Sequence, residues 1–572
     1  RSTLFPYTTL FRSALAKHFC IKVKQAEKED PAVKRITESD MIAAYLSDES
    51  RQTGTTDCVF LPESEEDVIY ILKNSSGKHI TTQGARTGLT AGCVPQGGIT
   101  ISMELMDKVL DIDLKCDKPY ITVQPGIILQ NLRYDLAFQG FFFPPDPTET
   151  TAEIGGMTAC NSSGARSYRY GSVRDHILEL DVILAGGDKI HLVRNPKCKA
   201  HGREFSLTTK NGNVVSGRLP DITMPNVSKH TAGYFIKPDM DMIDLFIGSE
   251  GTLGIITSAK LALKKLPKHT WGIVVFFKRE SDVISFVKKM RSVDNGLTIT
   301  PEALEFFGAD ALRLMRSADI EDTSLDKVTS DFKISGDAKC ESRTCGAPLC
   351  PSGCNRRTSA ADRDPTISDY GISDFGLCAI YTEFISDDIA ELKSNFQKLS
   401  DVIIACGGDP QITWGALDPT RLSKLKDFRH ATPACVNEQI GHIKKDFPSI
   451  TKLGTDMSVP DDCLEEILSM YRKDLFAGGF QSAAFGHIGD NHIHVNIIPR
   501  SNEEYARGKA LYSRWAQNVV KMGGSVSAEH GIGKLKVWLL KELYSPCQID
   551  AMHQLKKLFD PEEQLNSGNI FG

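Results

Sequence analysis

A stretch near the C-terminal end of the chain alternates polar and apolar residues with a period of two. Two imidazoles and an amide alternate with aliphatic side chains along His492, Ile493, His494, Val495, Asn496 and Ile497. This period predicts a half-buried strand whose apolar face packs on the core. A polar edge strand with satisfied histidines would show the same pattern. However, four of the 14 histidines of the chain lie in Gly486–Asn496 and Ser527–Gly531, and this concentration favours a functional site.

The residue types in these two segments are those of a divalent metal site. Zinc and similar cations bind imidazoles and carboxylates, and a catalytic site uses about three protein ligands and keeps one position open. His487, His494 and Glu529 supply two nitrogens and one oxygen. A turn at Gly489–Asn491 would let the chain fold back between the two histidines. His530 then remains as a free imidazole beside the cation, a proton acceptor near neutral pH.

Two further features bear on this metal site. Glycines that would let the backbone around the carboxylate approach its neighbours closely are Gly523, Gly524, Gly531 and Gly533. The histidine spacing matches no common zinc signature. The residue types therefore predict a metal site, and the spacing alone does not identify its class.

Upstream, the apolar pattern alternates between helix-like and strand-like periods. Ser64–Asp67 caps an apolar-periodic helix that runs through Leu72. In the first part of the chain we expect a helix near 127–138 and strands at 79–82, 99–102, 109–113, 120–124, 178–184 and 190–193. A second unit begins near Trp271 and continues with helix-rich sequence over 386–400 and 419–447. Together these patterns predict an α+β protein.

The same patterns suggest where the domains begin and end. The expected units are a helical segment over 14–54, a first α+β domain over 55–267, a second over 268–470, and a final part over 471–572. Residues 1–13 resemble a translated sequencing adapter, and we expect them to be an artefact rather than a targeting peptide.

A polar stretch at about 317–373 interrupts the second α+β domain. It holds four cysteines, Cys340, Cys345, Cys350 and Cys354. Their spacing fits neither the usual zinc knuckles nor the common ferredoxin runs. A surface insertion with idle thiols is therefore favoured over a metal cluster.

Composition narrows the class of protein and of partner. The chain has 572 residues, 41% of them apolar and 24% charged, with a net charge of −6; these values are ordinary for a folded protein of two or three domains. The absence of a basic block argues against a nucleic-acid partner. No apolar run reaches the ~18–20 residues of a membrane span. Fifteen scattered cysteines indicate reduced thiols and a cytoplasmic protein.

Two glycine-rich loops in the first domain are candidate phosphate-binding sites. Gln83–Thr90 follows a predicted strand, and its glycines and threonines can turn backbone N–H groups toward an anion. The second loop, Gly155–Gly164, follows Pro144–Thr148. Either loop alone could lack a ligand. Neither is a Walker A motif or a G-x-G-x-x-G, which disfavours a Rossmann NAD domain. Two such loops in one domain suggest a long diphosphate cofactor.

Read in order, these motifs resemble the FAD-linked oxidases. These are the vanillyl-alcohol-oxidase (PCMH-type) flavoproteins, which include D-lactate dehydrogenase, the glycolate oxidase flavin subunit and D-2-hydroxyglutarate dehydrogenase. The resemblance rests on the two loops, on Gly171–Asp175 and Gly248–Gly254, and on both histidine segments. It implies a PCMH-type FAD-binding domain over 55–267, an α+β substrate cap over 268–470, and a C-terminal helical segment that returns to the flavin.

The resemblance also implies roles for individual residues. The pyrophosphate would lie on Gly84, Ala85, Arg86, Thr87 and Gly88. Isoalloxazine and adenine contacts would come from Pro145, Thr148, Gly155, Ala159, Ser162, Gly164, Val173, Glu250 and Ile255. The family's metal ligands match His487, His494 and Glu529, and its substrate-side residues match Asn496, His530, Arg429 and Lys452. Some relatives attach FAD through a histidine in the first loop. Because this loop has Arg86 and no histidine, we expect noncovalent FAD.

The implied activity is an FAD-dependent oxidation of a D-2-hydroxy acid, with D-lactate giving pyruvate. Arg429 and Lys452 would hold the carboxylate, and the metal, expected to be zinc, would polarise the 2-hydroxyl. His530 would take the hydroxyl proton while hydride passes from Cα to flavin N5. Electrons would then pass to a quinone, a cytochrome or an electron-transfer flavoprotein. Peripheral contact with the inner membrane and a homodimer are open expectations.

Several alternatives remain at this point. Within the family, they are D-2-hydroxyglutarate dehydrogenase and the glycolate oxidase flavin subunit. The first would need an extra cation for the distal carboxylate. Outside this chemistry, they are a zinc hydrolase that uses the His/Glu site to activate water, and a noncatalytic flavoprotein subunit of a larger oxidase.

Overall fold

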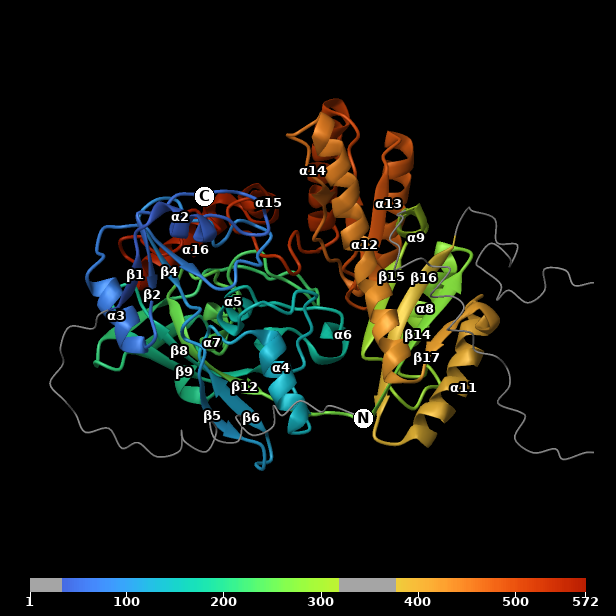
Figure 1. Ribbon diagram of the computed structural model, residues 1–572, viewed down its shortest axis with the longest axis horizontal. Coiled ribbons are helices and arrows are strands. Elements are labelled where there is room, and N and C mark those ends of the chain that lie inside the picture. Colours follow the sequence, from blue (N-terminus) through green and yellow to red (C-terminus); the bar gives the residue numbers. More distant parts are fainter. Residues whose placement is uncertain (1–32, 318–376) are drawn as a thin grey trace, which may run out of the picture.

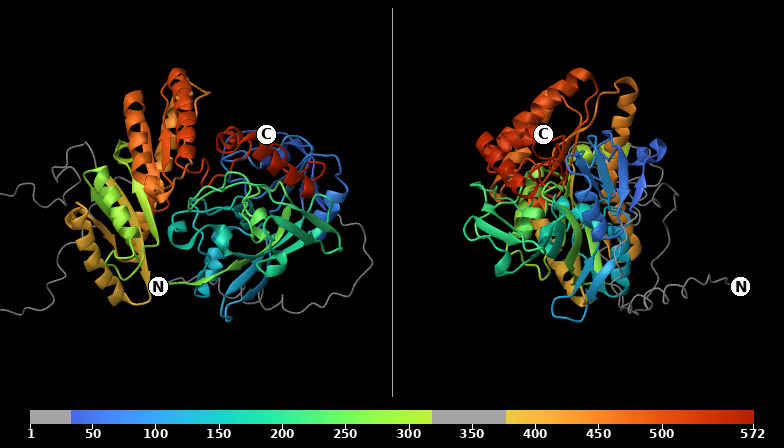
Figure 2. Two further views of the ribbon diagram at one scale, coloured as in Figure 1. Left: turned by 180° about the vertical axis from the view of Figure 1, so that it is seen from behind. Right: turned by 90° about the vertical axis from the view of Figure 1, so that its left-hand side faces the viewer.

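The computed structural model describes residues 33–317 and 377–572 and has two halves that lie side by side (Figure 1). The N-terminal half comprises residues 33–267 together with the last helices of the chain. The cap half comprises residues 268–317 and 377–521. The view from behind in Figure 2 shows the same two halves, with the C-terminal end on the N-terminal half. Residues 1–13 and the cysteines of the 317–373 stretch lie outside the described residues.

The N-terminal half contains two main sheets. The first, in the order β1-β2-β4-β3, consists of β1 (Lys34–Ile36), β2 (Cys58–Leu61), β4 (Ile99–Ser102) and β3 (Ile80–Gln83). The second is antiparallel, in the order β5-β6-β12-β8-β9, and consists of β5 (Val109–Asp113), β6 (Tyr120–Val123), β12 (Ile255–Ala262), β8 (Ile177–Ile183) and β9 (Lys189–Val193). Two small pairs join β7 (Phe141–Phe142) to β13 (Lys264–Lys265) and β10 (Glu204–Thr208) to β11 (Val214–Arg218).

Short helices accompany these sheets. They are α2 (Ser39–Ile42), α3 (Glu65–Lys73), α4 (Leu129–Phe138), α5 (Ile154–Ala159), α6 (Ser167–Tyr170) and α7 (Ile243–Phe246). The predicted start of α3 is confirmed, because Ser64 and Asp67 form a capping box in which each side chain bonds the other's backbone N–H. The strands predicted in this half are also confirmed, with ends shifted by at most one residue. The helical segment expected over 14–54 contains α2 in its described part, and also the strand β1, which pairs with β2.

The cap half is built on a seven-stranded antiparallel sheet in the order β17-β14-β16-β15-β19-β20-β18. Its strands are β17 (Trp414–Ala416), β14 (His269–Phe277), β16 (Cys378–Ser386), β15 (Ala303–Phe307), β19 (Ser482–Gly486), β20 (His494–Ile497) and β18 (Leu453–Gly454). Because β20 lies between two strands, the alternative of a polar edge strand is wrong. The sheet also continues past residue 470, so β19 and β20 belong structurally to the cap.

Longer helices belong to the cap half and lie over its sheet and beyond one end of it (Figure 1). They are α8 (Glu280–Arg291), α9 (Ala309–Ser317), α11 (Ile389–Ala405), α12 (Pro419–Asp446), α13 (Leu464–Gly478) and α14 (Asn502–Lys521). One continuous buried cluster includes Val182 of β8, Phe306 of β15 and Trp515 of α14. The apolar core therefore spans both halves.

The chain returns to the N-terminal half at its end, as expected. Helices α15 (Val537–Leu543) and α16 (Pro546–Phe559) lie there (Figure 1), and Ile80 of β3 exchanges backbone hydrogen bonds of 2.8 Å with Gln564 and Asn566. All cysteines of the described residues are free thiols. No helix among the described residues is long and apolar enough to cross a membrane.

Candidate active site

The tight connection between β19 and β20 places His487 and His494. The chain leaves β19 at Gly486, turns over Ile488–Asp490, and passes Asn491 in the left-handed conformation with φ of 50°. Only glycine fits at 486, because φ is 129° and an added Cβ would lie 2.9 Å from His494 Cδ2. The predicted turn between the two histidines is confirmed, and it brings them to the same end of the cap sheet.

Glu529 comes from a separate segment that folds over these histidines. The backbone N–H groups of Glu529 and His530 donate to the two oxygens of Asp456, at 3.1 and 3.0 Å. Gly531 follows with φ of 73°, and an added Cβ there would lie 2.7 Å from Glu250 Oε1. The close backbone approach predicted from the glycines is confirmed at this position.

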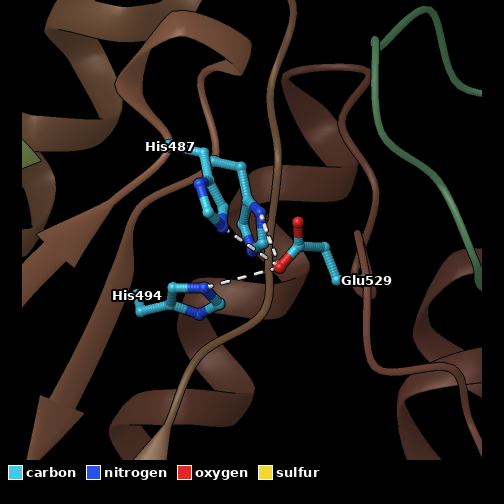
Figure 3. A group of neighbouring side chains, drawn as sticks. His487, His494 and Glu529 are labelled. Atoms are coloured by element: carbon cyan, nitrogen blue, oxygen red, sulfur yellow. Dashed lines mark ion pairs between the residues drawn. The ribbon is translucent and has the colours of Figure 1, made fainter. Parts of the chain in front are cut away.

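One oxygen of Glu529, Oε2, faces three imidazoles. It lies 3.2 Å from His487 Nε2, 3.9 Å from His492 Nδ1 and 3.8 Å from His494 Nε2. Figure 3 shows His487 and His494 pointing toward this carboxylate. The four ligand-type atoms lie within 4.8 Å of one another. Donors bound at ~2.0–2.2 Å to one tetrahedral cation are about 3.4 Å apart, so these four side chains fit a divalent cation.

Each of the three imidazoles turns its second ring nitrogen to an acceptor. The pairs are His487 Nδ1 with Glu305 Oε1 (2.8 Å), His494 Nδ1 with the Thr455 carbonyl oxygen (3.1 Å) and His492 Nε2 with Asp456 Oδ1 (3.1 Å). An acceptor on one nitrogen holds a proton there and leaves the other nitrogen's lone pair directed at the cluster. This arrangement is typical of histidines that bind metals.

The three imidazoles differ in their affinity for a proton. Burial opposes protonation of His487, but Glu305 and Glu529 outweigh it and raise the pKa of His487 to about 9. Burial and a neighbouring imidazole lower the pKa of His492 to about 4 and that of His494 to about 3. Metal binding requires neutral imidazoles, so a bound cation would displace one proton, that on His487.

His530 lies beside the cluster with its ring stacked on His494, at 5.4 Å between centroids. Its Nδ1 is 3.5 Å from Asp456 Oδ2, and 28% of its side chain is exposed. Burial is the main cause that lowers the pKa of His530 to about 4, so the ring is neutral at pH 7 and can accept a proton. Asp456, His494 and His530 form a second group of ligand-type atoms within 4.8 Å.

The other oxygen of Glu529 binds two residues that sequence reasoning missed. Oε1 accepts hydrogen bonds from Lys229 Nζ at 2.6 Å and from Ser163 Oγ at 2.7 Å. The side chain of Lys229 is 1% exposed, and its Nζ also donates to the Gly164 carbonyl oxygen at 2.9 Å. Lys229 lies in none of the motifs and is 300 residues from Glu529. No periodicity or spacing in the sequence could have joined them.

Arg429, on α12, lies close to the cluster. Its guanidinium is 3.7 Å from Asp146 Oδ2 and its side chain is 8% exposed. Burial opposes ionisation of Glu305, but His487 and then Arg429 lower the pKa of that carboxyl. The Nε of Arg429 has no hydrogen-bond acceptor among the described residues. Arg429 therefore presents a buried, unused donor near the predicted metal ligands.

The other two predicted substrate residues differ in placement. Asn496 is two residues beyond His494 on β20 and therefore lies on the same face of the strand. Its Oδ1 would lie 2.8 Å from a Cβ added at Gly454. Lys452 donates instead to Asn437 Oδ1 at 2.9 Å, and in residues 33–317 and 377–572 no hydrogen bond or ion pair joins Lys452 to the histidine cluster.

The first glycine-rich loop has the free donors that a pyrophosphate needs. It follows β3, with Arg86 at φ of 60°. No described residue accepts a hydrogen bond from the backbone N–H groups of Gly84–Gly88. The Arg86 guanidinium lies over the Tyr45 ring at 4.8 Å. Because successive free N–H groups favour anions, this loop fits the diphosphate of FAD.

The second loop differs from the anion-binding nest that we expected. Gly155 N–H donates to the Pro125 carbonyl oxygen and Gly164 N–H to Ser167 Oγ, both at 2.8 Å. A Cβ added at Gly155 would lie 2.4 Å from Pro125 Cβ. These two glycines therefore serve close packing of the chain, and their N–H groups are used within the protein.

The remaining predicted cofactor residues lie in different environments. The side chains of Val173 and Ile255 are core residues with 1% exposure, so only their backbones could touch a cofactor. The Glu250 carboxylate accepts the N–H groups of Ile532 and Gly533 at 2.7 and 2.8 Å, and thereby ties the Glu529 segment to the N-terminal half. Pro145 is buried, Ala85, Thr87, Ala159 and Ser162 are half-buried, and Gly88 and Thr148 are exposed.

Comparison with known proteins identifies the family. The model of the FAD binding domain matches residues 56–192, and that of the C-terminal domain of FAD linked oxidases matches residues 356–570. A D-lactate dehydrogenase of Anaerostipes hadrus is 27% identical over 516 residues, which cover 89% of this chain and 88% of that protein. A D-2-hydroxyglutarate dehydrogenase of Stutzerimonas stutzeri (strain A1501) is 24% identical over 551 residues, covering 94% and 96%.

The fold agrees with this result. The solved structure of an alkyldihydroxyacetonephosphate synthase matches with a TM-score of 0.55 and 15% identity, and covers 90% of this chain and 76% of that one. This likeness concerns the fold alone. The predicted resemblance is confirmed, and the chain belongs to the FAD-linked oxidases.

Proposed function

We propose that this FAD-linked oxidoreductase is a dehydrogenase of D-2-hydroxy acids, with D-lactate as substrate and pyruvate as product. The observation that carries the proposal is the cluster of three imidazoles and Glu529 beside the free imidazole of His530 and the unused donor of Arg429. A hydroxy acid needs these three features: a cation site for its hydroxyl, a base for its proton and a cation for its carboxylate. Relatives named D-lactate dehydrogenase support the substrate class.

The substrate carboxylate would bind Arg429. A guanidinium presents a planar pair of donors that suits two carboxylate oxygens, and the Nε of Arg429 is free to donate. Asn496 would add an amide donor from the face of β20. Lys452 would have to leave Asn437 to join them, so we assign the carboxylate to Arg429 first.

His530 would accept the hydroxyl proton at Nε2, because its Nδ1 faces Asp456. Asp456 is fully buried, yet its pKa is held well below the usual range, because it pairs with the ammonium group of Lys536 at 2.8 Å. A carboxylate in that place stabilises the imidazolium that forms. General-base catalysis of this kind contributes about 10²–10⁴-fold.

His487, His494 and Glu529 would hold the divalent cation, which when bound would favour the alkoxide form of the substrate hydroxyl. The Gly84–Gly88 loop would hold FAD, which when bound would supply the hydride-accepting chemistry. Ser163 and Lys229 keep Glu529 oriented from the N-terminal half. The electron acceptor would be a quinone, a cytochrome or an electron-transfer flavoprotein.

A dicarboxylic D-2-hydroxy acid is a second candidate, because further guanidinium groups lie near Arg429. Asp146 lies within 3.9 Å of three guanidinium groups, those of Arg133, Arg166 and Arg429. The Nε of Arg166 also has no acceptor among the described residues. Arg166 could therefore serve a distal carboxylate, as in D-2-hydroxyglutarate.

Turnover with a set of substrates tests the proposal. FAD-loaded protein is assayed with an artificial dye acceptor and D-lactate, L-lactate, glycolate or D-2-hydroxyglutarate. We expect the highest kcat/KM with D-lactate; a higher value with D-2-hydroxyglutarate would favour the second candidate. A colourless protein that hydrolyses esters or amides would favour the zinc hydrolase. A yellow protein that reduces no dye with any hydroxy acid would favour a noncatalytic subunit.

A further inference from the structure

We propose that His492 is a fourth metal ligand, so that three imidazoles and one carboxylate hold the cation. The inference rests on the metal site of the proposed function and changes its coordination number. The motif match assigns the site to His487, His494 and Glu529 alone. The geometry of His492 does not distinguish it from those ligands.

His492 faces the cluster as closely as His494 does. Its Nδ1 is 3.9 Å from Glu529 Oε2, and His494 Nε2 is 3.8 Å from the same oxygen. The His492 ring centroid lies 4.3 Å from that of His494 and 5.4 Å from that of His487. The side chain of His492 is completely buried, so it faces these groups without solvent.

Asp456 determines which nitrogen of His492 carries the proton. His492 Nε2 lies 3.1 Å from Asp456 Oδ1. Asp456 also accepts Lys536 Nζ at 2.8 Å and Ser527 Oγ at 2.7 Å, and these donors require it to act as a carboxylate. A proton on Nε2 would face this carboxylate and leave the lone pair of Nδ1, which lies 3.9 Å from Glu529 Oε2, to a cation.

A purely structural histidine would leave this lone pair unused. Neither ring nitrogen of His492 has a hydrogen-bond partner among the described residues. A buried ring nitrogen without a partner is unfavourable, and the His494 ring and the Glu529 carboxylate lie beside this imidazole. A cation between these groups would bind the free nitrogen of His492 together with the neighbouring imidazole and the carboxylate oxygen. In metal sites, contacts behind each ligand orient it toward the cation in this way.

Four protein ligands change which metal suits the site. They fill the tetrahedral shell of zinc and leave no open position. A cation that accepts five or six ligands, such as Mn²⁺, Fe²⁺ or Co²⁺, keeps one or two positions for substrate oxygens. An active site of this kind would thus use such a cation rather than the four-coordinate zinc expected from sequence, and its open positions would take the substrate hydroxyl.

X-ray absorption of the Co²⁺-loaded protein tests the coordination directly, because the flavin does not contribute to the cobalt edge. Metal is removed with a chelator and replaced by Co²⁺ in the wild type and in His492→Asn, His487→Asn and His176→Asn. His176 is a matched control, since it is a buried imidazole of the N-terminal half whose Nε2 faces the Tyr170 carbonyl oxygen. Retained FAD absorbance shows that each variant is folded.

We expect three imidazoles and a total of five or six ligands in the wild type, and two imidazoles in His492→Asn. The Co²⁺ affinity of His492→Asn should fall by more than the roughly 10–100-fold that loss of an outer contact causes. Two imidazoles in the wild type, or an unchanged number in His492→Asn, would overturn the inference. If His487→Asn also leaves the count and the affinity unchanged, the metal site of the proposed function is itself wrong.

Discussion

The variant His530→Ala removes the imidazole that we propose as the acceptor of the substrate's hydroxyl proton. The structure indicates that the fold would survive this change. Asp456 would keep Lys536 Nζ at 2.8 Å, His492 Nε2 at 3.1 Å and the two backbone N–H groups. The hydrogen bond from Thr90 goes to the His530 carbonyl oxygen and is also kept. FAD should therefore remain bound.

The rate of flavin reduction should fall by the contribution of a general base. That contribution is about 10²–10⁴-fold, which corresponds to about 2.7–5.5 kcal/mol of activation free energy. The ring is 28% exposed, so the space it leaves is open to small molecules. Added imidazole should restore part of the rate. If His530 had only a structural role, added imidazole would not restore the rate.

Anaerobic rapid mixing of FAD-loaded His530→Ala with D-lactate measures this rate as loss of visible flavin absorbance. His442→Ala is the matched control, because His442 is an exposed histidine of α12 that pairs only weakly with Glu438, at 3.8 Å. It should reduce at the wild-type rate. Reduction of His530→Ala at that same rate, with FAD content unchanged, would refute the assignment of His530 as the base.

Three further predictions follow from the contacts of the cluster. His487→Ala and His494→Ala should each lower bound metal and activity together, because each removes one ligand; full metal occupancy by elemental analysis in both would mean that the ligands are misassigned. Lys229→Met should lower the free energy of unfolding by about 3–5 kcal/mol, since it leaves Glu529 as a buried carboxylate without its ammonium partner; a loss below about 1 kcal/mol in denaturant titration would contradict this. Arg429→Lys should raise KM for D-lactate about 10-fold, as expected when one charge-assisted hydrogen bond of about 1.4 kcal/mol is lost; an unchanged KM would place the substrate carboxylate elsewhere.

Local features of the fold were predictable from the sequence. The helix start at Ser64, the strands of the N-terminal half and the turn at 489–491 depend on neighbouring residues, and the structure confirms them. The period of two near the C-terminus also placed His492 and His494 on one face, and both rings lie in the cluster. Period and turn chemistry act over a few residues, so a single sequence contains them.

Features that depend on distant contacts were not predictable. The sequence contains no sign that Lys229 would pair with Glu529, because the pair forms only when the two halves pack together. Asp456 lies four residues after the predicted Lys452, yet its contacts with His492, His530 and Lys536 come from two other segments. The resemblance led to three metal ligands, and only the arrangement in space suggests a fourth.

Stereospecific reduction of the bound flavin tests the central claim most directly. FAD-loaded wild-type protein is mixed under anaerobic conditions with D-lactate, with L-lactate or with buffer alone, and the visible absorbance of the flavin is followed. We predict rapid and complete bleaching with D-lactate and none with L-lactate, because Arg429, the cation site and His530 can hold only one enantiomer with its Cα hydrogen toward the flavin. Equal bleaching by both enantiomers, or no bleaching by either D-lactate or D-2-hydroxyglutarate, would contradict the assignment of this chain as a D-2-hydroxy-acid dehydrogenase.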